Sequence, residues 1–387
     1  MEYRLEEIYD LQMGKTPSRN NSDYWNTEDY KWISIADLSK CNKYIENTKE
    51  YLSEAAVKES GISLIPSKTV IMSFKLSIGK TAITSEPMFS NEAIMSFRDK
   101  KVVDILPDYM YYMFTGKDWD VGTNKAVMGK TLNKATLSKF KVKIPPLEKQ
   151  RAAVKVLDKV SSIIETRKLE LDKLDELIKS RFVEMFGDPD TNPRGWDEFA
   201  LSEKLNVIGG YAFKSDQFDE ERGIPVLRIG NINAGFFRPV NLVYWQEDEN
   251  LERYVMYPGD LVMSLTGTVG KDDYGNVCIL GDDYEMYYLN QRNAKLEIKE
   301  GIDKYYLSQL LKFEQVKKKL TGISRGVRQA NISNKDILNL VVPVPPMELQ
   351  NQFADFIKQT DKLKVKVQQS LDETQILMDS LMQKYFG

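Results

Sequence analysis

The segment IPPLEKQ at Ile144–Gln150, followed by LIKSRFVEMFG at Leu177–Gly187, decides the fold because the chain contains it twice. The second copy is VPPMELQ at Val344–Gln350 and LMDSLMQKYFG at Leu377–Gly387, with each residue number raised by 200. The two copies align without a gap at Pro145/Pro345, Pro146/Pro346, Glu148/Glu348, Gln150/Gln350, Leu171/Leu371, Asp172/Asp372, Ser180/Ser380, Phe186/Phe386 and Gly187/Gly387. A repeat of such long period indicates a duplicated domain with its helix, not a solenoid of short repeats.

Each copy predicts one long helix. Proline cannot continue a strand ladder but fits the first turn of a helix, so the Pro-Pro pairs mark the two helix starts. Glu148 and Glu348 then place a negative charge where the helix N-terminus favours it. Neither Pro nor Gly follows until Gly187 and Gly387. About forty residues at ~1.5 Å per residue give a helix of roughly 60 Å.

Apolar residues recur along both helices in steps that are mostly three and four, as in a coiled coil. The predicted seam of the helix pair consists of Leu157, Val160, Ile164, Leu171, Leu174 and Ile178 in the first helix, and of Phe353, Phe356, Leu363, Val367, Leu377 and Leu381 in the second. Arg167 interrupts the first stripe, and Thr360, Ser370 and Thr374 are weaker members of the second. Two copies of one helix are natural antiparallel partners. The alternative is two amphipathic helices that each cover their own domain.

Length and composition indicate a globular protein of two domains plus helices. The chain has 387 residues, of which 42% are hydrophobic and 29% are charged. Its two cysteines, Cys41 and Cys278, stand far apart, which argues against a disulfide or zinc site and favours a reducing compartment. The N-terminus lacks the features of a signal peptide, and no apolar run approaches the ~18 residues of a membrane span. We therefore expect a cytoplasmic protein.

The sequence contains no histidine. This excludes Ser-His-Asp and Cys-His catalytic pairs, histidine general bases and most transition-metal sites. The net charge of −3 is unusual for a stand-alone nucleic-acid-binding protein, which is normally basic. If the chain binds DNA, its positive charge must be local, or partner proteins must supply it.

The order of predicted strands and loops repeats as well. The interpretation is an α+β chain of two mixed α/β domains related by pseudo-two-fold symmetry and separated by two long antiparallel coiled-coil helices. The expected boundaries are residues 1–143 for the first domain, 144–187 for the first helix, 188–343 for the second domain and 344–387 for the second helix. The dipeptides Gly79-Lys80 and Gly270-Lys271 lie 191 residues apart, as do Met72-Ser73 and Met263-Ser264, and are therefore expected to be equivalent.

This arrangement resembles the specificity subunit of type I restriction–modification enzymes over the whole chain. The resemblance is carried by IPPLEKQ and VPPMELQ, by KSRFVEMFGDPDTNPRGW at Lys179–Trp196 and by SRGVRQANIS before the second helix. It implies two target-recognition domains that each recognise one half of a split, asymmetric DNA site. It also implies that the helices set the spacing and bind two methyltransferase subunits, which carry S-adenosylmethionine and methylate adenine. Restriction subunits, which use ATP and Mg²⁺, join to cut unmodified DNA. The resemblance implies no catalytic residue, metal or cofactor in this chain.

Candidate DNA-contacting residues are basic and amide side chains in polar loops, because Arg, Lys, Asn and Gln recognise base edges while Ser and Thr contact phosphates. In the first domain they are Lys15, Arg19, Asn20, Lys75, Lys80, Lys125, Lys130 and Asn133, and in the second Lys214, Arg228, Asn231, Thr266, Thr268, Lys271, Arg325, Arg328, Gln329 and Asn331. Each could instead be a solvated loop residue, and Asn331 has the alternative role of capping the turn before Ile332.

Three other functions remain open at this point. The chain could be the specificity subunit of another type of restriction–methylation enzyme, or a scaffold that holds two protein-binding domains apart. A stand-alone nuclease would use acidic residues such as Asp272, Asp273, Asp282, Asp283 and Glu285. No carboxylate-plus-lysine motif recurs in both copies, which argues against the nuclease.

Overall fold

The fold is described from a computed structural model of the full chain. The structure describes residues 1–25, 27–75, 77–117, 119, 124–126, 129–233, 235–268, 271, 273–322 and 329–387, with only the backbone described at 124–126, 129–131 and 329. The chain divides into two compact units. Unit 1 comprises Met1–Lys168 and Gln369–Gly387, and unit 2 comprises Leu169–Gln368.

Unit 1 is a mixed α/β unit around a five-stranded sheet of order β2-β9-β6-β7-β4, with a three-stranded sheet of order β5-β3-β8. Its strands are β1 (Glu2–Arg4), β2 (Tyr9–Met13), β3 (Tyr30–Ile33), β4 (Tyr44–Ile45), β5 (Glu50–Leu52), β6 (Val70–Ser73), β7 (Thr81–Thr84), β8 (Phe89–Ser90), β9 (Ile94–Asp99), β10 (Asn124–Ala126), β11 (Gly129–Thr131) and β12 (Lys141–Lys143). Its short helices are α1 (Leu5–Ile8), η1 (Ser22–Tyr24), α2 (Ile35–Lys40), α3 (Glu54–Ser60), α4 (Pro107–Thr115) and α5 (Lys134–Ser138).

Unit 2 is built the same way around two four-stranded sheets, of orders β14-β22-β18-β20 and β16-β15-β21-β17. Its strands are β13 (Glu198–Ala200), β14 (Leu205–Gly209), β15 (Ile224–Leu227), β16 (Val243–Trp245), β17 (Val255–Met256), β18 (Leu261–Ser264), β19 (Thr266–Thr268), β20 (Val277–Ile279), β21 (Tyr287–Leu289), β22 (Asn293–Ile298), β23 (Gln329–Asn331) and β24 (Val341–Pro343). Its short helices are α7 (Leu201–Lys204), η2 (Ser215–Gln217), η3 (Ile229–Asn231), η4 (Glu249–Tyr254), α8 (Lys304–Lys312), α9 (Glu314–Thr321) and α10 (Asn334–Leu338).

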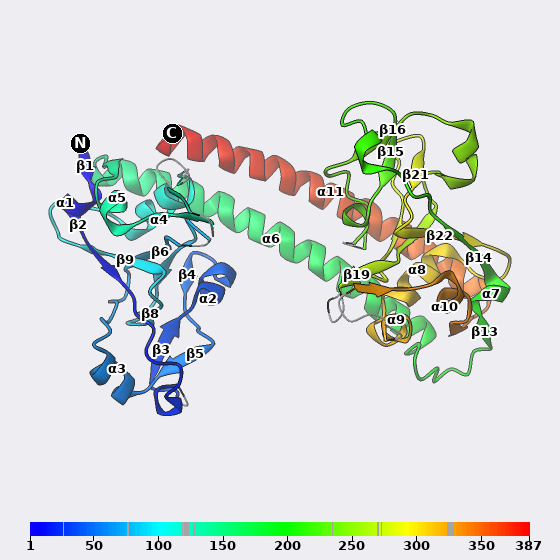
Figure 1. Ribbon diagram of the computed structural model, residues 1–387, viewed down its shortest axis with the longest axis horizontal. Coiled ribbons are helices and arrows are strands. Elements are labelled where there is room, and N and C mark those ends of the chain that lie inside the picture. The colour runs from blue at the N-terminus through cyan, green and yellow to red at the C-terminus, as the bar shows by residue number, and fades with distance from the viewer. Residues whose placement is uncertain are drawn as a thin grey trace. The chain divides into compact units, whose positions relative to one another are not determined.

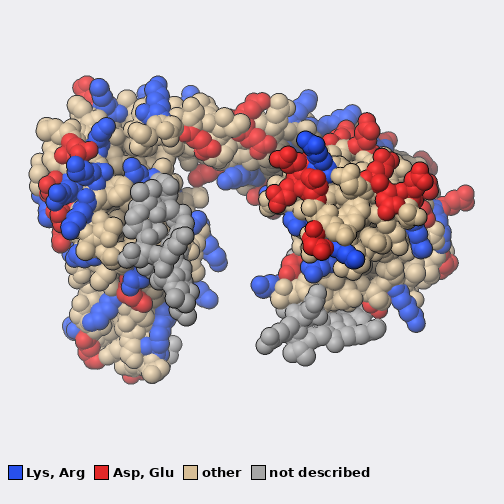
Figure 2. Space-filling view, turned by 45° about the horizontal axis from the view of Figure 1, so that its top comes forward, with Lys and Arg blue, Asp and Glu red and all other residues tan. Residues whose placement is uncertain are grey.

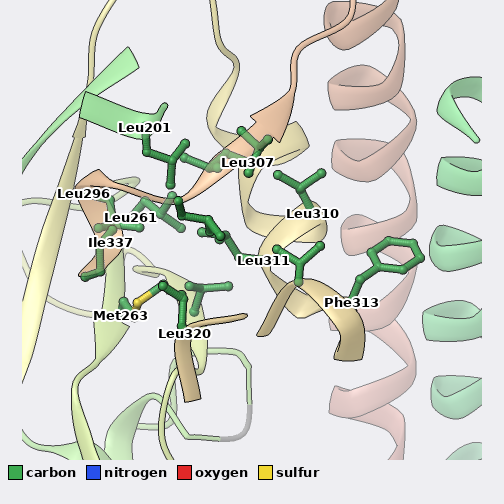
Figure 3. Close-up of a cluster of buried hydrophobic side chains, with 14 of the residues drawn as sticks. Leu201, Leu261, Met263, Leu296, Leu307, Leu310, Leu311, Phe313, Leu320 and Ile337 are labelled. Carbon is green, nitrogen blue, oxygen red and sulfur yellow. The ribbon is translucent and has the colours of Figure 1, made fainter. Parts of the chain in front are cut away.

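The main core of each unit lies between its central sheet, several short helices and the long helices. In unit 2 Leu261, Met263 and Leu296 of the sheet pack with Leu307 and Leu310 of α8. Figure 3 shows this cluster, with Phe313 directed from it toward the long helices. The alternating inward positions of the strands supply the apolar face that the helices cover.

The two long helices are α6 (Leu147–Phe186) and α11 (Met347–Phe386), each of 40 residues and continuous in Figure 1. Each unit contains the first part of one helix and the last part of the other. In unit 2, Phe182 near the end of α6 contacts Phe353 near the start of α11, with ring centroids 5.5 Å apart. The two helix segments are therefore antiparallel within this unit, as predicted.

The glutamine that ends each IPPLEKQ-type motif joins the helix start to its domain. Gln150 is fully buried, and its amide donates to the carbonyls of Asp104 and Pro145 and accepts from the backbone N–H of Leu106. Gln350 is equally buried and makes the equivalent bonds to Gly301, Pro345 and Asp303. Repetition of this glutamine thus has a structural cause, because a buried amide needs partners.

Burial along α6 follows the predicted seam, and burial along α11 follows it only in part. Leu157, Val160, Ile164 and Ile178 are buried, and Leu171 and Leu174 are half-buried. In the second helix, Phe353 is buried and Phe356, Val367 and Leu381 are half-buried. Leu363 and Leu377, however, are 53% and 50% exposed.

The stripe that α11 buries follows a different register from the predicted one. Ile357, Thr360 and Leu371 are buried, and Lys364, Val367 and Thr374 are half-buried, which gives steps of three and four from 357 to 374. Thr360 and Thr374 were expected as weaker members of the seam, whereas the half-buried Lys364 was not expected in it. Within the described residues, no helix is long and apolar enough to cross a membrane.

Candidate nucleic-acid interface

In each unit the same backbone hydrogen bonds bring three segments together at one end of the central sheet. In unit 1 the N–H of Gly14 donates to Ile94, that of Phe74 to Ala93 and that of Leu132 to Phe74, at 3.0 to 3.1 Å. The matching bonds of unit 2 run from Gly210 to Asn293, from Leu265 to Arg292 and from Ile332 to Leu265, at 2.8 to 3.2 Å. We call these bonds the loop frame. It places polar loops of different sequence at equivalent positions in both units.

In unit 2 the loop frame continues into a two-stranded ribbon, β19 with β23. Thr266 lies opposite Asn331, and Thr268 lies opposite Gln329. Four predicted residues are thereby brought together, although the side chain of Gln329 lies outside the described residues. The Thr266 hydroxyl is inaccessible to solvent and has no hydrogen-bond partner among the described residues. The backbone N–H of Thr268 donates to Asp273 Oδ1 at 2.7 Å.

The hydrogen bond from Thr268 lowers the pKa of Asp273, because it stabilises the ionised carboxylate. An ionised Asp273 therefore supports the ribbon through its hydrogen bond to Thr268. No group of three or more His, Cys, Asp or Glu residues among the described part of the chain could hold a metal ion.

In unit 1, Lys15, Lys75 and Lys80 lie at the segments that the loop frame joins. Lys15 and Lys80 are exposed, and Lys75 is half-buried with its ammonium 5.4 Å from the ring of Phe74. Lys15 also donates to the carbonyl of Ser60. The side chains of Lys125 and Lys130 lie outside the described residues.

The predicted equivalence of Gly79-Lys80 with Gly270-Lys271 is wrong. Ser73 exchanges hydrogen bonds with Gly79 and Lys80, and Ser264 exchanges the same bonds with Gly275 and Asn276. Gly79 and Gly275 both have positive φ, at 86° and 69°, a conformation that favours glycine. The loop of unit 2 is longer, so a second glycine before a lysine falls inside it by coincidence. Gly270 itself lies outside the described residues.

Arg19 is held in an aromatic cage instead of pointing freely into solvent. Its guanidinium carbon lies 3.7 Å from the centroid of Trp25 and 4.8 Å from that of Trp32. Both terminal nitrogens also bind the carboxylate of Glu50. Contact between Arg19 and a base would break these bonds, whereas its neighbour Asn20 is exposed.

The amide of Asn231 is structural, which corrects its prediction as a DNA contact. The side chain is 2% exposed. It accepts from the N–H of Arg228 and donates to the carbonyls of Arg238 and Val240. Arg228 in turn donates from its guanidinium to the carbonyl of Asn241.

The remaining predicted residues fall into three groups. Asn133 is exposed but caps α5 by accepting from the N–H of Thr136 at 2.8 Å, a common role for asparagine. Lys214 and Lys271 are exposed loop residues. Arg325 and Arg328 lie outside the described residues. The structure therefore leaves their contact with DNA as a prediction.

One residue of the loop frame was missed from the sequence. Arg292 is exposed, and its carbonyl accepts from Leu265 directly before the ribbon begins. The equivalent residue in unit 1 is Ala93. In both copies an asparagine two residues earlier, Asn91 or Asn290, accepts from the backbone N–H of this residue and so caps the turn. That repeated asparagine was the signal that could have located Arg292.

Comparison with known proteins agrees with the duplicated architecture. A family model for the type I restriction modification DNA specificity domain matches residues 1–175 and 193–374. Two specificity subunits of type I restriction enzymes from Methanocaldococcus jannaschii are similar in sequence. One, MjaVIII, is 28% identical over 74% of this chain and 69% of its own length. The other, MjaIX, is 26% identical over 60% of this chain and 58% of its own length.

Solved structures show the same fold. The S subunit of a type I restriction–modification system from M. genitalium aligns over the whole of this chain and 96% of its own, with a TM-score of 0.57 and 13% identity. A chain from a structural study of assembly and conformational transition in a type I system aligns over the whole of this chain and 97% of its own, with a TM-score of 0.55 and 17% identity.

Proposed function

Because the chain belongs to the family of type I restriction modification DNA specificity proteins, we propose that each of its two domains recognises one half of a split, asymmetric DNA site. The chain is a specificity subunit and not a catalyst on its own. The proposed domains are residues 1–143 and 188–343, joined by helices over 144–187 and 344–387. Recognition at half-sites about one helical turn apart, roughly 34 Å, would match paired major-groove binding.

The observation that carries the proposal is the loop frame. The same backbone bonds hold loops of different sequence in both units, with Lys75 and Lys80 in one and Thr266 and Asn331 in the other. A constant frame with different side chains favours two ligands of one kind that differ in sequence. Lysine suits phosphates and guanine, and asparagine suits adenine.

The helices offer a surface for two copies of one partner. Val156, Ile163 and Leu177 of α6 are 37% to 48% exposed, and Leu363 and Leu377 of α11 are 50% to 53% exposed. Consecutive members differ in number by 7 or 14 within each helix, and Ile163/Leu363 and Leu177/Leu377 are equivalent positions of the repeat. We call these five residues the outer stripe. A repeated apolar stripe supports docking of two methyltransferase subunits, one on each helix.

The full complex would supply the chemistry. Methyltransferase subunits would carry S-adenosylmethionine and methylate adenine, and restriction subunits would use ATP and Mg²⁺ to cut unmodified DNA. Such a complex would act in the cytoplasm, where chromosomal DNA is found.

The adenine methylome of the source cell, with the gene intact and deleted, tests the proposal. Deletion is expected to remove one motif made of two short half-sites around a fixed gap. An unchanged methylome in a cell that expresses the methyltransferase would contradict it. The control is the same deletion complemented by the intact gene, which should restore the motif.

A further inference from the structure

Unit 2 has a cavity of about 900 Å³ between α8, α9, the loop from β19 to β20 and the long helices. Six lysines line it: Lys179, Lys271, Lys312, Lys317, Lys318 and Lys364. Among the described residues, two carboxylates line it, Asp175 and Glu314. The cavity is therefore strongly positive, although the chain as a whole is slightly acidic and Asp and Glu gather on one face of unit 2 in Figure 2.

The two carboxylates already have lysine partners. Lys364 pairs with Asp175 at 2.6 Å, and Lys318 pairs with Glu314 at 2.5 Å. Burial lowers the pKa of Lys312, and the positive charge of Lys364 lowers it further. Asp361 is not part of the lining but also attracts Lys312 and Lys364. Among the described residues six lysines still face only three carboxylates, and an anionic ligand would relieve the repulsion between the lysines.

The cavity adjoins the candidate interface. Asn276, whose N–H donates to Ser264 directly before β19, also accepts from the ammonium of Lys317 at 2.5 Å. Lys271 lies in the same loop, between β19 and β20. A ligand bound to the ribbon of β19 and β23 would therefore pass beside these lysines.

The cavity described in unit 1 is not positive. This cavity, of about 760 Å³, also lies between a domain helix, α4, and a long helix, α6. Four carboxylates line it, Asp37, Glu46, Asp158 and Glu165, against three lysines, Lys40, Lys43 and Lys49. Lys43 is also engaged with Asp108 and Asp158, at 2.5 and 2.6 Å.

We propose that the lysine cavity of unit 2 binds backbone phosphates of the DNA beside the half-site that this unit recognises. The proposal rests on the proposed function, since it assumes that the ribbon faces DNA. Lysine binds phosphate as a mobile point charge without sequence information, so the contact adds affinity but no specificity. Since carboxylates outnumber lysines in the lining of the unit 1 cavity, the phosphate contacts would be asymmetric about the DNA site.

The first test compares two double variants in the assembled complex with methyltransferase subunits. In K312Q/K317Q two cavity lysines lose their charge, and in the matched control K40Q/K49Q two lysines of the unit 1 cavity lose theirs. Affinity is measured for a duplex with the methylated motif and for an unrelated duplex, between 50 and 200 mM salt. For K312Q/K317Q we expect about tenfold weaker binding to both duplexes and a salt slope reduced by about two, because each neutralised phosphate contributes about 0.9. For K40Q/K49Q we expect no change.

Unchanged affinity and salt slope in K312Q/K317Q would overturn the inference, as would an equal loss in K40Q/K49Q. Weaker assembly with the methyltransferase, at unchanged DNA affinity, would also overturn it and would identify an acidic protein segment as the occupant. The methylome separates failure of this inference from failure of the proposed function. If a split methylated motif is found, the proposed function holds whatever these variants show, and if no such motif is found, the proposed function has failed.

A second measurement uses the unaltered complex. Methylphosphonate groups, which are neutral, replace single phosphates along the duplex. We expect weaker binding at phosphates beside the half-site of unit 2 and a smaller effect at the matching phosphates beside the other half-site. Equal effects on both sides would contradict the asymmetry.

Discussion

The ring of Phe386, at the end of α11, lies 5.2 Å from the ring of Tyr109 in α4. The equivalent ring of Phe186, at the end of α6, lies 4.9 Å from Tyr306 in α8. The helix that begins in one unit therefore ends in the core of the other. The repeated Phe-Gly sequence marks the residue that closes each unit, not merely the end of a helix.

Phe186→Ala is expected to destabilise unit 2 by about 3 kcal/mol or more, because its buried ring also contacts Phe182 and Phe353. Phe386→Ala removes a half-buried ring and is expected to cost about 1–2 kcal/mol. Urea unfolding of the two variants measures both values. Equal costs would contradict the burial difference between the two helix ends.

Gln150→Ala is expected to lower the free energy of unfolding by about 2–3 kcal/mol, because it strands the N–H of Leu106 and the carbonyl of Asp104. Gln350→Ala should have a similar effect in unit 2. Gln359→Ala, an exposed position on α11, is the matched control and should change stability by less than about 0.5 kcal/mol. If all three variants unfold at the same urea concentration, the buried amides contribute nothing.

The duplication, the long helices and their starts could be predicted from the sequence, because prolines, buried glutamines and aromatic helix ends leave local, repeated signals. The seam of α11 could not be predicted fully. Lys364 is half-buried because its ammonium reaches Asp175 on α6, a pairing across 189 residues that composition does not reveal. Leu363 beside it stays exposed, so apolar character alone gives the wrong face.

The sequence indicated two segments that the structure brings together, but it did not give the contacts of each side chain. The segment with Asn331 and the segment with Thr266 were both singled out, and the structure pairs them directly. Asn231 and Arg19 are residue types that can recognise bases, but both are engaged in tertiary contacts. The amide of Asn231 binds backbone carbonyls, and the guanidinium of Arg19 contacts two tryptophan rings and Glu50. Whether such a side chain is available to contact DNA depends on its contacts with residues distant in sequence, which the sequence alone does not show.

Replacing the exposed leucines of α11, in L363S/L377S, is expected to weaken binding of one methyltransferase subunit by about tenfold or more and to leave the other bound, since loss of apolar contact area at an interface costs over about 1 kcal/mol. I163S/L177S on α6 is the matched variant for the other subunit. Stoichiometry and affinity are measured by calorimetry with purified methyltransferase.

Leu371→Ala, within the buried stripe, is the control and should instead lower the free energy of unfolding by about 2 kcal/mol or more. Full binding of two subunits by both serine variants would show that the outer stripe is not the docking surface.

Asp273→Asn is expected to lower stability at neutral pH. The pKa of Asp273 is lowered in the folded protein, so its ionised form stabilises the fold above the unfolded pKa of about 3.9. That contribution is lost as the pH falls through the lower folded pKa. The difference between variant and wild type should therefore shrink from pH 7 to about pH 3 in urea unfolding. A difference that stays constant over this range would mean that the charge of Asp273 does not support the ribbon.

Insertion of one heptad into α6 between Leu157 and Ile178, with a matching heptad in α11, tests whether the helices set the spacing of the half-sites. Seven residues preserve the 3.5-residue repeat of the seam and add about 10 Å at ~1.5 Å per residue. That length corresponds to about three base pairs at ~3.4 Å each. The methylated motif should keep both half-sequences and gain about three base pairs in its gap. A four-residue insertion is the control, because it rotates Ile164 and Leu171 out of register and should destabilise the pair instead. A seven-residue variant that folds and methylates the original motif would show that the spacing is set elsewhere in the complex.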